Sequence, residues 1–250
     1  MKVRTISTLQ PSPVGSSGME GYCLVPLEDG MGHIIYEIRL PEHYKGKLAP
    51  AFENTDHIYY CIAGKISVEF EGESARKLEA DDFLAMPGYT TCSITVLEPV
   101  RLMVVYCPAT GNTSRPRYVH KSLKEVIASD LNVAWGNGES RRFLVKKDGY
   151  SVAISNTLGY PNKQSYLEYK NLLESAYYIG GVGKYVWDDD RAEHTYGRDE
   201  DVKGTMMVMD KHDPHVMTIE EETSICLCTF SPPIVGDEVH TLDGSGYSSY

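Results

Sequence analysis

The stretch HIYYCIAGKISVEFEG at residues 57–72 consists mainly of β-branched and aromatic residues and ends at a turn glycine. A similar stretch, ESAYYIGGVGKYVW, occupies residues 174–187. Short apolar runs bounded by turn residues are typical of strands joined by tight turns. Comparable runs include SITVLEPVRLMVVYC at 93–107 and TSICLCTFSPP at 223–233. The pattern predicts an all-β fold, either a sandwich or a barrel.

The two halves of the chain repeat the same order of features. LEDG at residues 27–30 precedes an apolar strand, and KKDG at 146–149 does the same in the second half. The two Asp-Gly pairs are offset by 119 residues, and His57 and Glu174 are offset by 117. Self-similarity at one period indicates an internal duplication. We therefore expect two small β-barrels, at residues 1–112 and 136–250, with a linker at 113–135.

The linker contains the one clear helix signal. Ser122 followed by Glu125 forms a capping box. Leu123, Val126 and Ile127 then give an apolar face at helical spacing. These residues predict a short linker helix over residues 121–130.

Composition and charge narrow the classes of function. The chain has 250 residues, of which 42% are hydrophobic and 24% charged, as in ordinary globular proteins. Its formal charge of -11 repels phosphate backbones and anionic lipids, so we expect no nucleic-acid and no membrane partner. Residues 1–15 lack the apolar stretch of a secretory signal, which predicts a cytoplasmic protein. The six cysteines form no CxxC pair, which favours buried free thiols.

Each half contains a strand ending about seven residues before a turn glycine, and some thirty residues later a Pro-Gly or Asp-His turn. This arrangement is similar to the two sequence motifs of the cupin family, whose members are double-stranded β-helix (jelly-roll) barrels. The resemblance implies a bicupin. In the first half, Glu53, His57 and Cys92 fall at cupin ligand positions and form a candidate metal site. The alternative is that His57 is a hydrogen-bonded histidine of the barrel wall.

The second half resembles one cupin subfamily, ectoine synthase, from about residue 118 onward. The resemblance is carried by SRRFLVKKDGYSVAISNT at 140–157, EYKNLLESAYYIGGVG at 168–183 and GTMMVMDKHDPHVM at 204–217. Its most specific piece is the tail CLCTFSPPIVGDEVHTLDGSGY at 226–247, because packing alone does not require GDEVHTLDGSGY after a strand.

The resemblance implies a metal site at Glu174 and His215. The third family ligand, a tyrosine, falls on Met207, and a neutral thioether does not replace an anionic phenolate on iron. The resemblance implies Fe2+ or another divalent metal as the cofactor. The methionine at position 207 leaves a metal-free site as the alternative.

The resemblance also implies a substrate pocket. Its catalytic residues are Glu238, His240 and Tyr169, and its substrate-binding residues are Ser140, Thr157, Cys228 and Phe230. The family's pocket tryptophan falls on Gly138, which predicts a wider pocket. Independently of the family, Glu238 and His240 lie two residues apart, so an extended tail projects both from one face. Burial can then move both pKa values toward neutrality.

Ectoine synthases close a ring by losing water, when the free amine of an N-acetylated diamino acid attacks the acetamide carbonyl. The leading hypothesis is a cyclising hydro-lyase that acts on a small amino-acid-derived substrate. Two alternatives stay open. One is a metal-dependent bicupin oxygenase or isomerase that uses the first barrel, and the other is a non-catalytic bicupin that binds a small metabolite. The duplication predicts either a monomeric pseudo-dimer, in which the first barrel replaces a partner subunit, or a homodimer.

Overall fold

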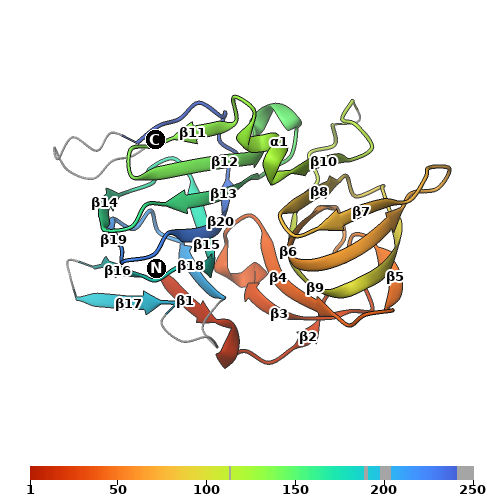
Figure 1. The fold of residues 1–250 in the computed structure, drawn as a ribbon, viewed down its shortest axis with the longest axis horizontal. Coiled ribbons are helices and arrows are strands. Elements are labelled where there is room, and N and C mark those ends of the chain that lie inside the picture. The colour runs from red at the N-terminus through yellow and green to blue at the C-terminus, as the bar shows by residue number, and fades with distance from the viewer. Residues whose placement is uncertain (113, 189–190, 198–203, 241–250) are drawn as a thin grey trace.

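Two β-barrels lie side by side in the computed structural model, which describes residues 1–112, 114–188, 191–197 and 204–240 (Figure 1). The predicted all-β fold with two tandem barrels is confirmed. All strand pairings are antiparallel. Within the described residues, no helix is long and apolar enough to cross a membrane.

The first barrel is one nine-stranded sheet with the order β10-β8-β6-β9-β4-β3-β2, in which β5 pairs with β9 and β7 pairs with β6. Its strands are β2 (Ser12–Pro13), β3 (Glu20–Val25), β4 (Ile34–Leu40), β5 (Lys45–Leu48), β6 (Thr55–Glu69), β7 (Arg76–Glu79), β8 (Asp82–Met86), β9 (Cys92–Pro108) and β10 (Val119–Ser122).

The second barrel has a seven-stranded sheet, β1-β18-β15-β20-β13-β12-β11, and a four-stranded sheet, β14-β19-β16-β17. The strands of the larger sheet are β1 (Lys2–Thr5), β11 (Asn132–Ala134), β12 (Gly138–Leu144), β13 (Ala153–Gly159), β15 (Leu173–Gly180), β18 (Thr205–Met209) and β20 (Ser224–Ser231). Those of the smaller sheet are β14 (Lys163–Leu167), β16 (Gly183–Trp187), β17 (Ala192–Tyr196) and β19 (His215–Ile219).

The two large sheets have the same strand order, and each takes one edge strand from outside its own barrel segment, β1 from the N-terminus and β10 from the linker. β10 pairs with β8 in the first barrel, and β1 pairs with β18 in the second. β1 and β10 occupy equivalent ends of their sheets. The repeated Asp-Gly turns are also equivalent, because each ends a short 3-10 turn at a left-handed glycine, Gly30 or Gly149. This exchange ties the N-terminus to the second barrel and the linker to the first.

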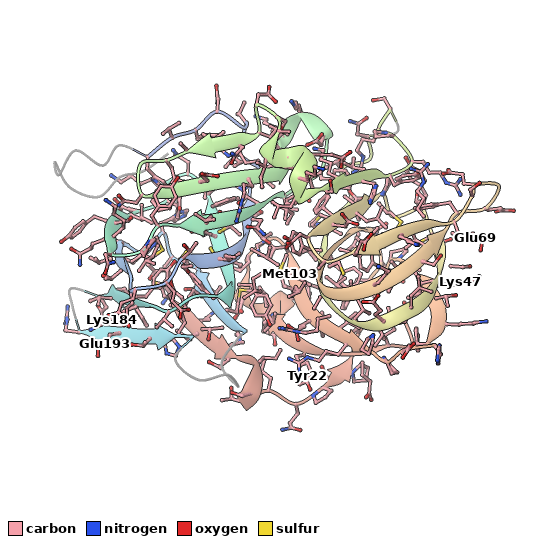
Figure 2. All side chains as sticks on the ribbon, in the orientation of Figure 1. Tyr22, Lys47, Glu69, Met103, Lys184 and Glu193 are labelled. Atoms are coloured by element: carbon pink, nitrogen blue, oxygen red, sulfur yellow. The ribbon has the colours of Figure 1, made fainter. Side chains whose placement is uncertain are left out.

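The barrels share an apolar layer formed by the outward faces of their sheets. Met103, labelled in Figure 2, belongs to this layer together with Phe143, Tyr177 and Leu227 of the second half. Buried polar contacts cross the same layer. Tyr177 donates a 2.5 Å hydrogen bond to Glu37, and His33 Nε2 lies 2.9 Å from Ser175 Oγ. The two barrels therefore bury side chains against each other as one unit.

The linker helix is shorter than predicted. α1 spans Leu123–Ile127, and the predicted capping box between Ser122 and Glu125 is present. Residue 121 is not helical because residues 119–122 are engaged as β10 with β8. Ile127 is 46% exposed, so Val126 alone is buried from the predicted apolar face. As predicted, the six cysteines are free thiols.

Candidate active site

The strands of the second barrel place alternate side chains on its inner and outer faces. On β15, Ala176 and Tyr178 belong to the barrel's inner cluster, whereas Tyr177 packs against the first barrel. Glu174 shares the inner face and lines a cavity. The even positions of β15 therefore carry the side chains that are available for chemistry.

This cavity collects the predicted catalytic and substrate-binding residues. Its volume is about 40 Å³, which leaves room for a few water molecules, so a larger ligand has to displace lining side chains. The predicted residues that line it are Ser140, Thr157, Tyr169, Glu174, Cys228, Phe230, Glu238 and His240. Cys228 Sγ lies 3.5 Å from Cys226 Sγ, as expected for two thiols on one face of a strand.

The tail after β20 folds back against this cavity. His240 Nε2 lies 3.3 Å from the hydroxyl of Tyr169. The His240 ring also makes an edge contact with Trp135, with centroids 5.7 Å apart. The aromatic walls therefore hold the imidazole at the cavity.

Glu238 stands beside His240 as an anion. Burial opposes its ionisation, but hydrogen bonds from the backbone N–H groups of Gly236 and Val235 outweigh burial and lower its pKa. Arg142 adds to this effect, with Nη1 3.6 Å from Glu238 Oε2. The expectation that burial moves this pKa toward neutrality is wrong, because the turn supplies two N–H donors to the carboxylate.

The pKa of His240 also lies away from neutrality. Burial lowers its pKa to about 4, and the neighbouring charges of His215 and Arg142 act in the same direction. The imidazole is therefore neutral at pH 7 and can accept a proton. The expectation that burial moves the pKa of His240 toward neutrality is therefore also wrong, because burial lowers it to about 4.

Glu174 is the carboxyl group whose pKa lies near neutrality. Burial raises its pKa to about 7, and hydrogen bonds with Cys228 and Tyr169 offset part of that rise. A group with this pKa exchanges protons efficiently at neutral pH.

His215 presents one ring nitrogen without a hydrogen-bond partner among the described residues. Its Nδ1 lies 2.8 Å from the carbonyl oxygen of Asp213 and donates to it, whereas the buried Nε2 has no partner. Burial lowers the pKa of His215 to about 4, so Nε2 carries a lone pair at pH 7.

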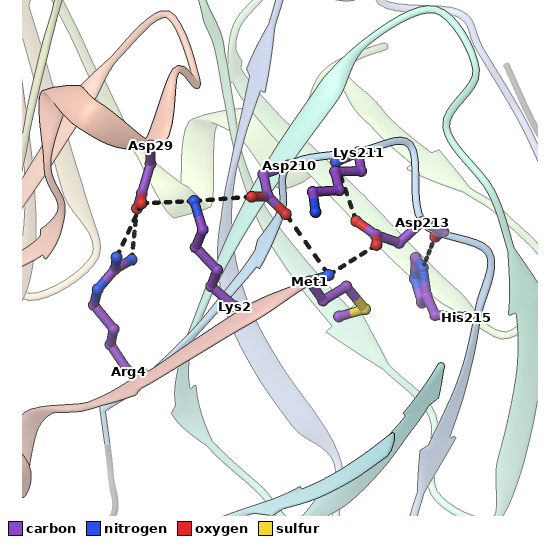
Figure 3. Close-up of polar contacts among 8 residues, drawn as sticks. All are labelled: Met1, Lys2, Arg4, Asp29, Asp210, Lys211, Asp213 and His215. Atoms are coloured by element: carbon purple, nitrogen blue, oxygen red, sulfur yellow. Dashed lines mark hydrogen bonds and ion pairs between the residues drawn. The ribbon is translucent and has the colours of Figure 1, made fainter. Parts of the chain in front are cut away.

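Strand β1 supports the turn that precedes His215. Lys2 bridges Asp29 of the first half and Asp210 of the second, at 2.9 Å each. Figure 3 shows this chain of charges, in which Arg4 also contacts Asp29 and the amino group of Met1 contacts Asp210 and Asp213. The exchanged strand thereby links the first half to a turn of the site.

The predicted metal site is incomplete. Glu174 and His215 supply a carboxyl oxygen and an imidazole nitrogen, but Met207 is a buried thioether on β18. Across the described ranges, no three His, Cys, Asp or Glu side chains gather around a common point. These donors do not reproduce the three-ligand site of the resemblance, so we derive no step through a metal.

The candidate metal site of the first barrel is not assembled. The two ring nitrogens of His57 are both engaged, Nε2 with the carbonyl oxygen of Thr90 and Nδ1 with the hydroxyl of Tyr59, at 2.9 Å each. Glu53 and Cys92 line different surface hollows. The grouping of Glu53, His57 and Cys92 is therefore wrong, and His57 is a hydrogen-bonded histidine of the wall. The interior of this barrel is closely packed with buried aliphatic, tyrosine and cysteine side chains.

The expectation of a wider pocket at Gly138 is also wrong. A Cβ atom on Gly138 would lie 2.0 Å from the carbonyl oxygen of Leu158 and 2.9 Å from the Trp135 ring. Trp135, three residues earlier, lines the cavity with its indole. The Trp135 side chain therefore fills the space that the family's tryptophan would fill from position 138.

Seven cavity residues were not predicted from the sequence, and Arg142, Tyr178 and Tyr185 are among them. Arg142 is 1% exposed and donates to Ser140 Oγ and to the carbonyl oxygen of Glu238. Tyr178 and Tyr185 line another part of the cavity. The signal for Arg142 is the pair of arginines within the apolar strand SRRFLV, and the signal for Tyr178 is its spacing of four residues from Glu174.

Replacing Glu174 by glutamine is expected to stabilise the protein above pH 7. A carboxyl whose pKa is raised on folding stabilises the fold fully below its usual pKa of 4.5 and loses that contribution as the pH rises toward 7. The shift corresponds to about 3 kcal/mol above pH 7. Denaturant unfolding of Glu174→Gln at pH 5 and pH 8 measures it, with the exposed Glu221→Gln as control. An equal effect at both pH values would contradict the assignment.

Comparisons with known proteins give the family of the second half of the chain. The ectoine synthase family model matches residues 118–249. The L-ectoine synthase of Desulfatibacillum aliphaticivorans is 35% identical over 128 residues, which cover 50% of this chain and 93% of that protein. That of Hahella chejuensis is 35% identical over 124 residues, covering 50% and 89%.

The double-barrel architecture has solved counterparts. The formate complex of Lactobacillus farciminis oxalate decarboxylase superposes with a TM-score of 0.70 at 12% identity, over 95% of this chain and 88% of that one. Protein Ylba from E. coli gives 0.71 at 14% identity, over 96% and 92%. At these identities the likeness shows the bicupin fold. Through the half of the chain that carries the cavity, the protein belongs to the ectoine synthase family, and it is a lyase of the cupin fold.

Proposed function

We propose that the second barrel catalyses a cyclodehydration, in which the amine of a small N-acetylated diamino acid attacks its own acetamide carbonyl and water leaves. The observation that carries this proposal is the return of the tail into the barrel, which places His240 beside Tyr169 at the cavity. The named relatives make L-ectoine, which supports the reaction type.

The charges of the cavity suit an amino-acid-derived substrate. Arg142 is a planar guanidinium, which matches the geometry of a carboxylate. Glu238 is an anion beside it and attracts a substrate ammonium group. A molecule with a carboxylate and an ammonium group in close proximity is therefore complementary to this pair. Ser140 and Thr157 add hydroxyl groups that orient it.

The titratable groups divide the proton transfers between them. The neutral imidazole of His240 accepts a proton from the attacking amine. Glu174, whose pKa is about 7, is partly protonated at neutral pH and delivers a proton to the departing oxygen. Tyr169 contacts both His240 and Glu174 and keeps the two within one hydrogen-bonded group.

Mass spectrometry of the purified protein with a panel of N-acetylated diamino acids tests the proposal. The expected result is a product lighter than its substrate by one water. If every member of the panel is bound without conversion, the non-catalytic bicupin that binds a metabolite replaces this proposal. Metal analysis of the same sample shows whether an ion accompanies the active protein, because Fe2+ or another divalent metal stays a prediction.

The packed interior of the first barrel supports a structural role for that half. Its inner face is filled by aliphatic, aromatic and thiol side chains, and its sheet covers the outer face of the second barrel. We infer a pseudo-dimer, in which the first barrel occupies the place of a second subunit. Size-exclusion chromatography with light scattering tests this, with 27.9 kDa expected for a monomer. A stable larger assembly would support the homodimer instead.

A further inference from the structure

Two tyrosine hydroxyls meet on one wall of the cavity, and the proton transfers above use neither of them. Tyr178 extends from β15 and Tyr185 from β16, so the pair joins the two sheets of the barrel. Their hydroxyl oxygens lie 2.6 Å apart. Both side chains line the cavity, and they are 3% and 2% exposed.

The Tyr178–Tyr185 pair can offer a hydroxyl donor to a ligand. Each phenol supplies one hydroxyl donor and is protonated at neutral pH. The bond between the two hydroxyls consumes one of the two protons. Among the described residues, Met217 Sδ lies within hydrogen-bond distance of the pair, at 3.3 Å from Tyr178 and 3.5 Å from Tyr185, and the Tyr196 hydroxyl also interacts with that of Tyr178. A thioether is a weak acceptor, so the Tyr185 hydroxyl, which has no stronger acceptor than Tyr178 and Met217 among the described residues, can donate to a ligand oxygen while Tyr178 donates to its neighbours.

The pair is fixed in place by its surroundings. The Tyr178 ring stacks on Tyr196 at 3.7 Å, and the Tyr196 hydroxyl bonds Ser224 Oγ at 2.9 Å. The Tyr185 ring packs against His215, with centroids 5.2 Å apart. A donor held in a site that excludes water stabilises developing charge without reorganising first. The bond between the hydroxyls also polarises the free proton.

We propose that the Tyr178–Tyr185 pair binds the substrate's carbonyl oxygen and stabilises the negative charge that develops there. This inference rests on the proposed cyclodehydration. The amine nitrogen bonds to the carbonyl carbon, and the π electrons move onto the oxygen that the pair holds. The amine loses one proton and the oxygen gains one. The C–O bond then breaks, a C=N bond forms, and the departing water carries away both hydrogens of the amine.

Phenylalanine variants test this role. Tyr185→Phe and Tyr178→Phe are each expected to lower kcat by about a hundredfold to a thousandfold, with KM changed less than about threefold. The matched control is Tyr106→Phe, which removes a buried tyrosine hydroxyl from the core of the first barrel, outside the cavity lining. The pair's role is overturned if kcat is unchanged, if KM alone changes, or if the control loses as much as the pair.

The wild-type protein is assayed first, so that failure of the proposed function is recognised separately. If no N-acetylated diamino acid is converted, the pair is tested by infrared spectroscopy with acetamide labelled with 13C at its carbonyl. The expected result is a carbonyl band that moves to lower frequency with the wild-type protein and not with the double phenylalanine variant. Identical bands for the two proteins overturn the inference.

Discussion

Replacement of His240 by asparagine is expected to lower kcat by about a thousandfold, within the range that a positioned acid or base contributes. Asparagine keeps a polar side chain of similar reach, but it cannot accept a proton from the substrate amine. The fold is expected to survive, because residues 232–240, the described part of the tail, contribute no strand to either sheet. Steady-state kinetics of the variant with the substrate found by mass spectrometry measures the loss.

The control for this experiment is His43→Asn, which lies on the first half. The His43 side chain is 86% exposed and its backbone has a φ of 68°, a conformation that asparagine adopts readily. It is expected to retain full activity. A His240→Asn enzyme with more than a third of wild-type kcat would remove His240 from the mechanism.

Replacement of Glu37 by glutamine is expected to destabilise the whole protein by about 3 to 5 kcal/mol, the usual result of breaking a buried ion pair. The Glu37 side chain is fully buried. It accepts hydrogen bonds from Arg39 and Arg101 of its own barrel and from Tyr177 of the second barrel. Its charge also compensates Arg101, which is 27% exposed. The free energy of unfolding from denaturant titration measures the effect.

The matched control is Glu98→Gln, because Glu98 is 61% exposed and 3.5 Å from Lys65. An exposed pair of this kind contributes at most about 1 kcal/mol. Since the shared apolar layer joins the barrels, we expect one cooperative unfolding transition in the wild type. Two separate transitions would show that the barrels are independent, and a loss at Glu37 no larger than that at Glu98 would contradict the role of the buried cluster.

Local sequence signals predicted the parts of the fold that depend on neighbouring residues. The Asp-Gly turns and the capping box at Ser122 are determined within four residues, and both are present. The exchange of β1 and β10 was not predicted. The sequence of residues 2–5, KVRT, does not indicate which sheet they join, and β1 pairs with residues 200 or more positions away. The same limit explains why residues 121 and 122, at the end of β10, were predicted as the start of a helix.

The sequence predicted the residues of the candidate site at the positions where this chain has the same residue type as the family motif. Glu238, His240 and Tyr169 meet at the cavity. Compensating positions could not be predicted, because they depend on three-dimensional packing. Trp135 replaces the ring that Gly138 lacks, and the Tyr185 hydroxyl enters from the opposite sheet. The pKa directions at Glu238 and Glu174 depend on backbone donors and burial that composition does not show.

The pKa of His240, measured by NMR of 15N-labelled imidazoles, tests the central claim most directly, because it reports whether the tail is buried at the cavity. The His240→Asn spectrum assigns the signal by its loss. We predict a pKa of about 4, so that the ring stays neutral at pH 6. A pKa at the usual 6.5 would show an imidazole in water, and the tail would then lie outside the barrel.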